Sequence, residues 1–200
     1  MASIVGSAPL ERLHAGDQAL VEDPQFQAQV GNSRSLTEKL IEAVKEAHKS
    51  CVDTETFQLG QEDVDNLAIV ARNINMPTPP VLRVSAENVS VESGLTQVTE
   101  GLLLYQAMLN ATYPKLQKNE QVVALIADIK DLVVQLNKML KMANAAKSVQ
   151  PTPAPVELRL DSEYRVQVAI HLTLVHLQSF GHDMSRWLRQ LDQSEEEEET

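Results

Sequence analysis

Three histidines lie near the end of the chain, His171, His176 and His182. Histidine is the commonest metal ligand in proteins, and two histidines on one helix hold a metal when they are four residues apart. Here the spacings are five and six residues, which put the rings on different helix faces. We therefore interpret them as ordinary helix histidines and predict no metal site and no cofactor.

The other reactive side chains form no catalytic constellation. Cys51 is the single cysteine, and His48 is the one histidine near it in the sequence. A lone thiol is more often inert than nucleophilic, and the serines and aspartates are scattered without the tight turn that exposes a hydrolase nucleophile. We predict no catalytic residues and a protein that is not an enzyme.

The lone cysteine and two glycosylation motifs favour different compartments. With one cysteine no intrachain disulfide can form, which favours a reducing compartment. Asn88 and Asn110 each begin an N-x-Ser/Thr motif, and such acceptor sites are used in secreted proteins. The start of the chain has neither the basic residues nor the apolar run of a signal peptide. The chain is therefore either intracellular or a mature secreted chain without its leader.

A strip of small and acidic residues is the most unusual surface in the sequence. Ala124, Asp128, Asp131 and Gln135 follow one another at i, i+4, i+7 and i+11, so they share one helix face. That face lies roughly 100–160° from the apolar seam of the same segment, at about 100° per residue. From the residues alone it is either a solvated face or an acidic surface for a basic partner.

Composition excludes several other classes of partner. The net charge is −11, which argues against nucleic acid and against an anionic membrane surface. No apolar run approaches the ~20 residues needed to span a bilayer, so we predict no membrane insertion. Five consecutive glutamates at 195–199 predict a disordered acidic tail over residues 193–200.

Apolar residues recur at spacings of three and four, which predicts an all-α chain. Hydrophobic residues make up 43% of the chain, enough for one core, so we expect one helical domain over residues 24–192 after a flexible leader, 1–23. The longest helix should begin at a cap formed by Asp161 or Ser162, and Asn119 should cap another. Gly31 predicts a kink or a fresh helix start. We expect long helices at about 24–50, 93–112, 119–143 and 161–191, and a short one at about 61–73.

The lengths of the connections predict the topology. About six residues join the second and third long helices, and they reach only ~20 Å. They cannot return along a helix of about 30–35 Å, so these helices are expected to be antiparallel neighbours. The other connections, 51–92 and 144–160, are long enough to run the length of the bundle. We therefore expect a four-helix bundle, up-up-down-down, with two long crossover connections. An up-down-up-down bundle remains possible if both segments are only loops.

The chain resembles the long-chain helical cytokines of the interleukin-6 / granulocyte colony-stimulating factor family, and most closely its granulocyte colony-stimulating factor branch. The order and approximate spacing of the similar segments agree over residues 24–191. In that branch they read LQEKL, GLFLYQ, LDVAD, HLQSF and VLRHL. Here they read LTEKL at 36–40, GLLLYQ at 101–106, ADIKD at 127–131, HLQSF at 176–180 and WLRQL at 187–191.

The resemblance implies a secreted cytokine or growth factor that crosslinks class I cytokine receptor chains, of the granulocyte colony-stimulating factor receptor or interleukin-6 receptor type, on haematopoietic or immune cells. Asp128 and Asp131 match an Asp-x-x-Asp that contacts receptor in the family. Polar residues from the front of the first helix join that site, which implies Gln25 and Gln27 here.

A second receptor patch in the family uses a glutamate four residues past a cysteine, which implies Glu55 after Cys51. The family usually closes its first long connection with two disulfides, and this chain retains only Cys51. The alternative function is an intracellular four-helix scaffold or adaptor, which suits the lone cysteine and the acidic tail. A lipid-binding helical bundle is a third possibility.

Overall fold

The computed structural model describes residues 15–53, 55–60, 64–83, 89–143 and 154–192, and their regular structure is entirely helical. This confirms the prediction of an all-α chain with four long helices and a short helix in the first connection, although the short helix begins later than expected. The α-helices are α1 (Ala15–Val21), α2 (Pro24–Cys51), α3 (Ala68–Asn73), α4 (Val91–Thr112), α5 (Glu120–Met142) and α6 (Glu163–Leu191), with a 3₁₀ turn, η2 (Tyr113–Lys115), between α4 and α5.

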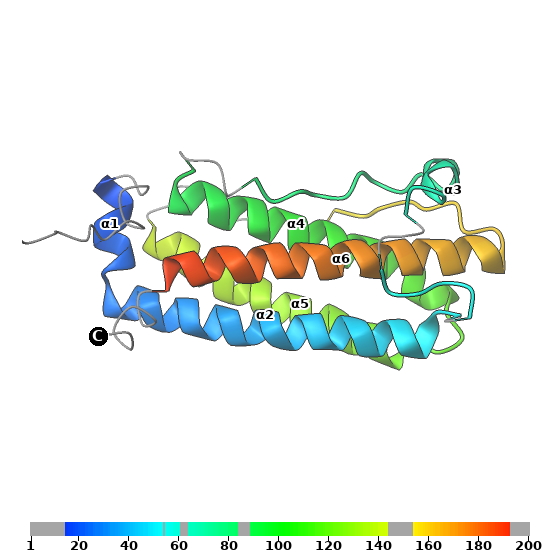
Figure 1. Ribbon diagram of the computed structural model, residues 1–200, viewed down its shortest axis with the longest axis horizontal. Helices are drawn as coiled ribbons and strands as arrows, with labels where there is room; N and C mark the ends of the chain where they lie inside the picture. Colours follow the sequence, from blue (N-terminus) through cyan, green and yellow to red (C-terminus); the bar gives the residue numbers. More distant parts are fainter. Residues whose placement is uncertain (1–14, 54, 61–63, 84–88, 144–153, 193–200) are drawn as a thin grey trace, which may run out of the picture.

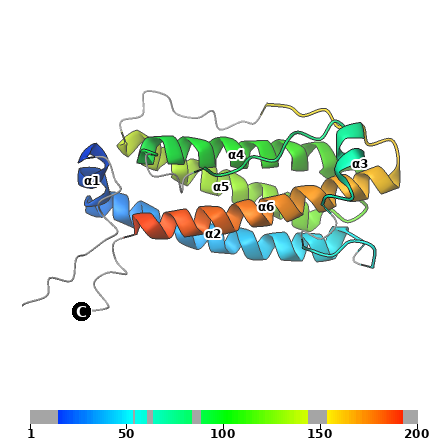
Figure 2. The same ribbon diagram turned by 45° about the horizontal axis from the view of Figure 1, so that its top comes forward.

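The four long helices lie side by side, with α1 at one end and α3 at the other (Figures 1 and 2). Each of α2 and α4 packs against both α5 and α6. At one end Gln27, near the start of α2, bonds to Leu191, the last residue of α6. Toward the other end His48 of α2 contacts His171 of α6. One apolar core runs between all four helices.

Side-chain caps begin most of the long helices. Asp23 accepts from the amide of Gln25 at 2.7 Å at the start of α2, where Pro24 also favours a helix start. Ser162 accepts from the amide of Arg165 and caps α6, as predicted. The predicted cap at Asn119 is wrong: its side chain makes no cap bond and instead donates to the carbonyl of Tyr113 at 3.3 Å.

The predicted fresh helix start at Gly31 is also wrong, because α2 is continuous through it. Val30 and Ser33 on either side are fully buried. The Ser33 hydroxyl donates to the Sδ of Met139 on α5 at 3.3 Å. Packing of this turn against α5 therefore outweighs the ~1 kcal/mol propensity cost of one glycine.

Part of the predicted leader is folded. Residues 15–21 form α1, and Val21 at its end is buried. The carboxylate of Asp17 accepts from the amide of Val91 at 3.1 Å, so α1 satisfies a free donor at the start of α4. The prediction of a loose leader is wrong for these seven residues. Residues 1–14 and the predicted acidic tail lie outside the described residues.

Two glycines on α4 admit aromatic rings from α6. A Cβ at Gly94 would lie 2.4 Å from Cζ2 of Trp187, and a Cβ at Gly101 would lie 2.4 Å from Cζ of Phe180. Both rings are buried in the core. Tyr105, one turn after Gly101, packs beside Phe180 with ring centroids 5.3 Å apart. The absence of a side chain at the glycines therefore sets how closely α4 approaches α6.

We expect Gly101→Ala, and likewise Gly94→Ala, to lower the free energy of unfolding by about 1–3 kcal/mol, because each added methyl group overlaps an aromatic ring. Gly31→Ala is the matched control, since nothing lies within 4 Å of its added Cβ. That change should raise the free energy of unfolding by up to about 1 kcal/mol. Denaturant unfolding followed by circular dichroism measures all three. Equal stability of Gly101→Ala and Gly31→Ala would contradict this account of the α4–α6 contact.

Candidate functional site

The predicted acidic strip lies on α5 beside α2. Ala124 and Asp131 are exposed on the outer side of α5. Asp128 is more covered, with 15% of its side chain exposed, and its Oδ1 accepts from Nζ of Lys39 on α2 at 2.6 Å. The strip is therefore a feature of two helices, in which one carboxylate is already paired and the other faces solvent.

Lys39 belongs to this surface and was not predicted to. Its hydrogen bond to Asp128, and then the negative charge of Asp128, raise the pKa of Lys39. Burial lowers this pKa, and the charge of Asp131 raises it to a smaller extent. Lys39 therefore keeps its proton at neutral pH. Two carboxylates against one ammonium leave this patch with a net charge of −1. Such a patch favours a basic partner.

Gln135 does not belong to the exposed strip. Only 7% of it is exposed, and its side-chain amide donates to the carboxamide oxygen of Gln29 on α2. Its prediction as a surface contact is wrong, because this position of α5 faces α2 rather than solvent. Gln135 is a packing residue that joins two helices.

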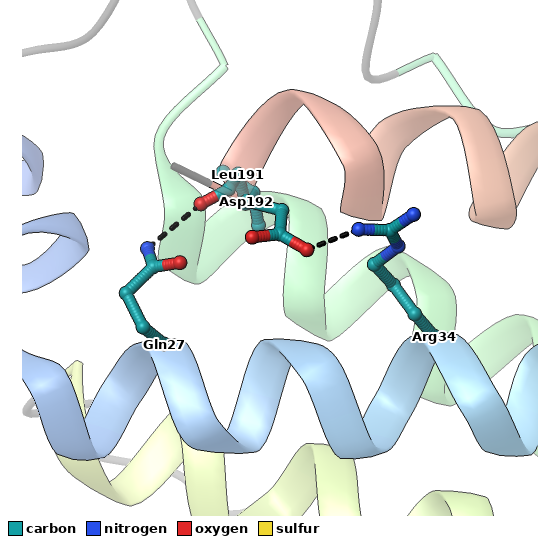
Figure 3. Close-up of polar contacts among 4 residues, drawn as sticks. All are labelled: Gln27, Arg34, Leu191 and Asp192. Atoms are coloured by element: carbon teal, nitrogen blue, oxygen red, sulfur yellow. Dashed lines mark hydrogen bonds and ion pairs between the residues drawn. The ribbon is translucent and has the colours of Figure 1, made fainter. Parts of the chain in front are cut away.

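The two glutamines predicted on the first helix have different roles. Gln25 is exposed in the first turn of α2. The Nε2 of Gln27 donates to the carbonyl of Leu191 at 2.8 Å (Figure 3). The same nitrogen donates to the carbonyl of Val21 at 2.6 Å. Gln27 therefore joins the start of α2 to the ends of α1 and α6 through hydrogen bonds. Gln25 is fourteen residues before Lys39, or roughly 20 Å along the helix, so the two cannot form one compact patch.

Arg34 adds an ion pair to the same contact between α2 and the end of α6. Its guanidinium bonds to the carboxylate of Asp192, the residue after α6 (Figure 3). Both side chains are largely covered. This end of the α2–α6 interface is thus held by a carboxamide and an ion pair.

The second predicted patch lies elsewhere. Glu55 is exposed in the segment after α2, where its amide donates to Oδ1 of Asp53 at 3.1 Å. The amide of Asp53 donates in turn to the side chain of Gln167 on α6 at 2.9 Å. Glu55 is therefore near the first turns of α6 and not on the α5 strip. Of the two glycosylation motifs, Asn110 is exposed on α4, and Asn88 lies outside the described residues.

A buried histidine pair is the polar feature that the sequence did not reveal. Nε2 of His48 on α2 lies 2.9 Å from Nδ1 of His171 on α6, and both rings are buried. Phe57, in the segment after α2, stacks on His171 with centroids 4.9 Å apart. Burial, and secondarily the charge of His171, lowers the pKa of His48 to about 4. The two histidines are 123 positions apart, so helix spacing alone could not pair them.

Burial shifts the pKa values of the remaining candidate reactive groups, Cys51 and His176. Burial raises the pKa of the Cys51 thiol to about 11, which disfavours the reactive thiolate. Burial also lowers the pKa of His176. Within the part of the chain that the structure describes, no three metal-ligating side chains are grouped to hold an ion. Over the same residues, no helix is both long and apolar enough to cross a bilayer.

Comparison of the chain with protein-family models and with curated proteins finds no match in either set.

Gln135→Ala should lower the free energy of unfolding by about 1 kcal/mol or more, because it removes a buried amide and the hydrogen bond to Gln29. Asp131→Ala on the same helix is the control and should stay within about ±0.5 kcal/mol, as surface changes usually do. Denaturant unfolding of both variants measures the difference. If Gln135→Ala is as stable as Asp131→Ala, Gln135 is not a packing residue.

Proposed function

We propose that this chain is a cytokine of the interleukin-6 / granulocyte colony-stimulating factor family, secreted, and acting by binding two class I cytokine receptor chains at separate surfaces. A rigid ligand of this kind needs no chemistry of its own. Holding two receptor chains at once brings their intracellular parts together, and the second contact gains from the proximity created by the first. Haematopoietic or immune cells are the responding cells.

The observation that carries the proposal is the pairing of helix ends, which supports an up-up-down-down bundle. Gln27 bonds to Leu191 and His48 to His171, so residue numbers rise along α2 as they fall along α6. The glycine contacts support the same antiparallel relation between α4 and α6. Gly94 lies against Trp187, and Gly101 lies against Phe180. Helices α2 and α4 then run the same way, which requires a long crossover between them. An experimental backbone with α2 and α4 antiparallel would contradict this topology.

Contact between two of the family-like segments also supports the proposal. Gly101 and Tyr105 belong to the GLLLYQ segment, and Phe180 closes the HLQSF segment. These residues meet in the α4–α6 interface. The two segments are thus parts of one packing arrangement rather than independent similarities.

The acidic strip is the first proposed receptor surface. Asp131 is exposed, and Asp128 is paired with Lys39 of α2. A receptor arginine or lysine would pair with Asp131, which lies three residues from Asp128 on the same helix face. Ala124 beside them adds little bulk, so a partner side chain can approach the helix closely. Glu55, near the start of α6, is the second surface.

We expect the double variant Asp128→Ala with Asp131→Ala to keep its helical spectrum and lose at least roughly tenfold in receptor affinity. Charge pairs at interfaces lose about 2–5 kcal/mol when one partner is truncated. The measurements are surface binding to purified class I receptor ectodomains and a reporter assay in cells that carry them.

The matched control is Glu38→Ala with Glu42→Ala, which removes the same charge from exposed positions of α2. It should keep both affinity and signalling. Equal affinity of the two double variants would contradict the assignment of the strip. Absence of any response from the unaltered chain across class I receptors would favour the intracellular scaffold, the other function compatible with a lone cysteine.

A further inference from the structure

We propose that the His48–His171 pair is an acid-sensitive latch, whose protonation releases the end of α2 and the segment carrying Phe57 from α6. This inference concerns the stability of one end of the bundle. It does not depend on whether the chain binds a cytokine receptor.

The contact between the rings requires that one facing nitrogen carries a proton and the other does not. Nε2 of His48 and Nδ1 of His171 are 2.9 Å apart, so one donates and the other accepts. A first proton on the pair can be shared along this hydrogen bond. A second proton places N–H against N–H and two positive charges side by side, away from water. The closed contact is therefore compatible with one added proton, whereas a second added proton destabilises it.

The folded chain resists this second proton. Burial, and then the charge of His171, holds the pKa of His48 near 4 against an ordinary value of 6.5. When the contact opens, His48 returns toward its ordinary pKa. At His48 the open form therefore binds more protons than the closed form between about pH 6.5 and pH 4, so protonation of this residue over that window favours opening. Below about pH 4 both forms are protonated and the effect levels off.

Among the described residues, an aromatic ring and several titratable side chains surround the pair. The electrostatic influence on His48 comes from His171, and His171 has further interactions of its own. Phe57 stacks on His171 and contributes no charge. Other titratable groups in the described parts of the surrounding elements include Lys45, Glu46, Lys49 and Cys51 on α2, Asp53 and Glu55 in the segment after it, Arg72 on α3, and Glu163, Tyr164, Arg165 and His176 on α6.

Opening should be local because the two ends of the α2–α6 interface differ in chemistry. The far end is held by Gln27, whose carboxamide does not titrate, and by the Arg34–Asp192 ion pair (Figure 3). The near end depends on two imidazoles and on the Gln167 bonds to Cys51 and Asp53. Release of the pair would expose Phe57 and loosen the segment that follows α2.

The test is amide hydrogen exchange of the full chain at pH 7.0 and pH 4.5, corrected for the intrinsic pH dependence of exchange. Protection over residues 44–53 and 164–175 should fall at least about tenfold more than protection over 24–34 and 184–191, since each unit of pKa difference is worth a factor of ten. A fall of equal size at both ends, or no fall, overturns the proposal.

His48→Gln should abolish the excess fall, because glutamine keeps a neutral donor and acceptor but takes no proton. His182→Gln, an exposed histidine of α6, is the matched control and should behave as the unaltered chain does. An unchanged fall in His48→Gln overturns the proposal. If His48→Gln does not fold, the imidazole of His48 is titrated by NMR in the unaltered chain. A midpoint below 6.5 supports the latch, and one at 6.5 or above overturns it.

Discussion

The broad apolar surface of α6 is the constraint on which the rest of the structure depends. Buried residues occur on it at nearly every turn from Val166 to Leu191, so a single neighbour cannot cover it. Helix α4 covers one side and approaches closely because Gly94 and Gly101 leave room for Trp187 and Phe180. Helix α2 covers another side, where Ile41 lies against Gly181. Once both neighbours are in place, α5 closes the remaining side of the core.

This arrangement separates packing residues from residues that can meet a partner. Gln135 and Gln27 are polar, yet each is used inside the bundle to join helices. Asp131 is left on the outer face, and Asp128 lies at the boundary with Lys39 of α2. A binding surface composed in this way is rigid, because the helices that carry it are fixed by the core beneath. Rigidity lowers the entropy lost when a partner binds.

The two ends of the α2–α6 interface are held by different chemical groups. The Arg34–Asp192 ion pair and the carboxamide of Gln27 hold one end. The other end places two imidazoles in a buried contact, and imidazole is the side chain that titrates closest to neutrality. Under the proposed latch, acid acts on the imidazole end of this pair of helices, and the end held by the ion pair and the carboxamide remains closed.

Regular packing was largely determined by the sequence. Apolar spacing predicted α2, α5 and α6 to within two residues at each end, because the core face of a helix must repeat every three to four residues. The cap at Ser162 marked a helix start for a local reason, the free amides of the first turn. The predictions of a cap at Asn119 and a helix start at Gly31 were wrong because the local preferences of these residues are small and packing outweighed them.

Tertiary structure decided which polar residues are exposed and which meet. A face of α5 that is polar in sequence can be solvated or packed on α2, and only the packing angle places Gln135 inside and Asp131 outside. Helix α1 is short and gains its fold from Val21 and from Asp17 at the start of α4. The Lys39–Asp128 and His48–His171 contacts join residues 89 and 123 positions apart. Periodicity describes one helix at a time, so contacts between helices depend on rotation and register that only the folded bundle supplies.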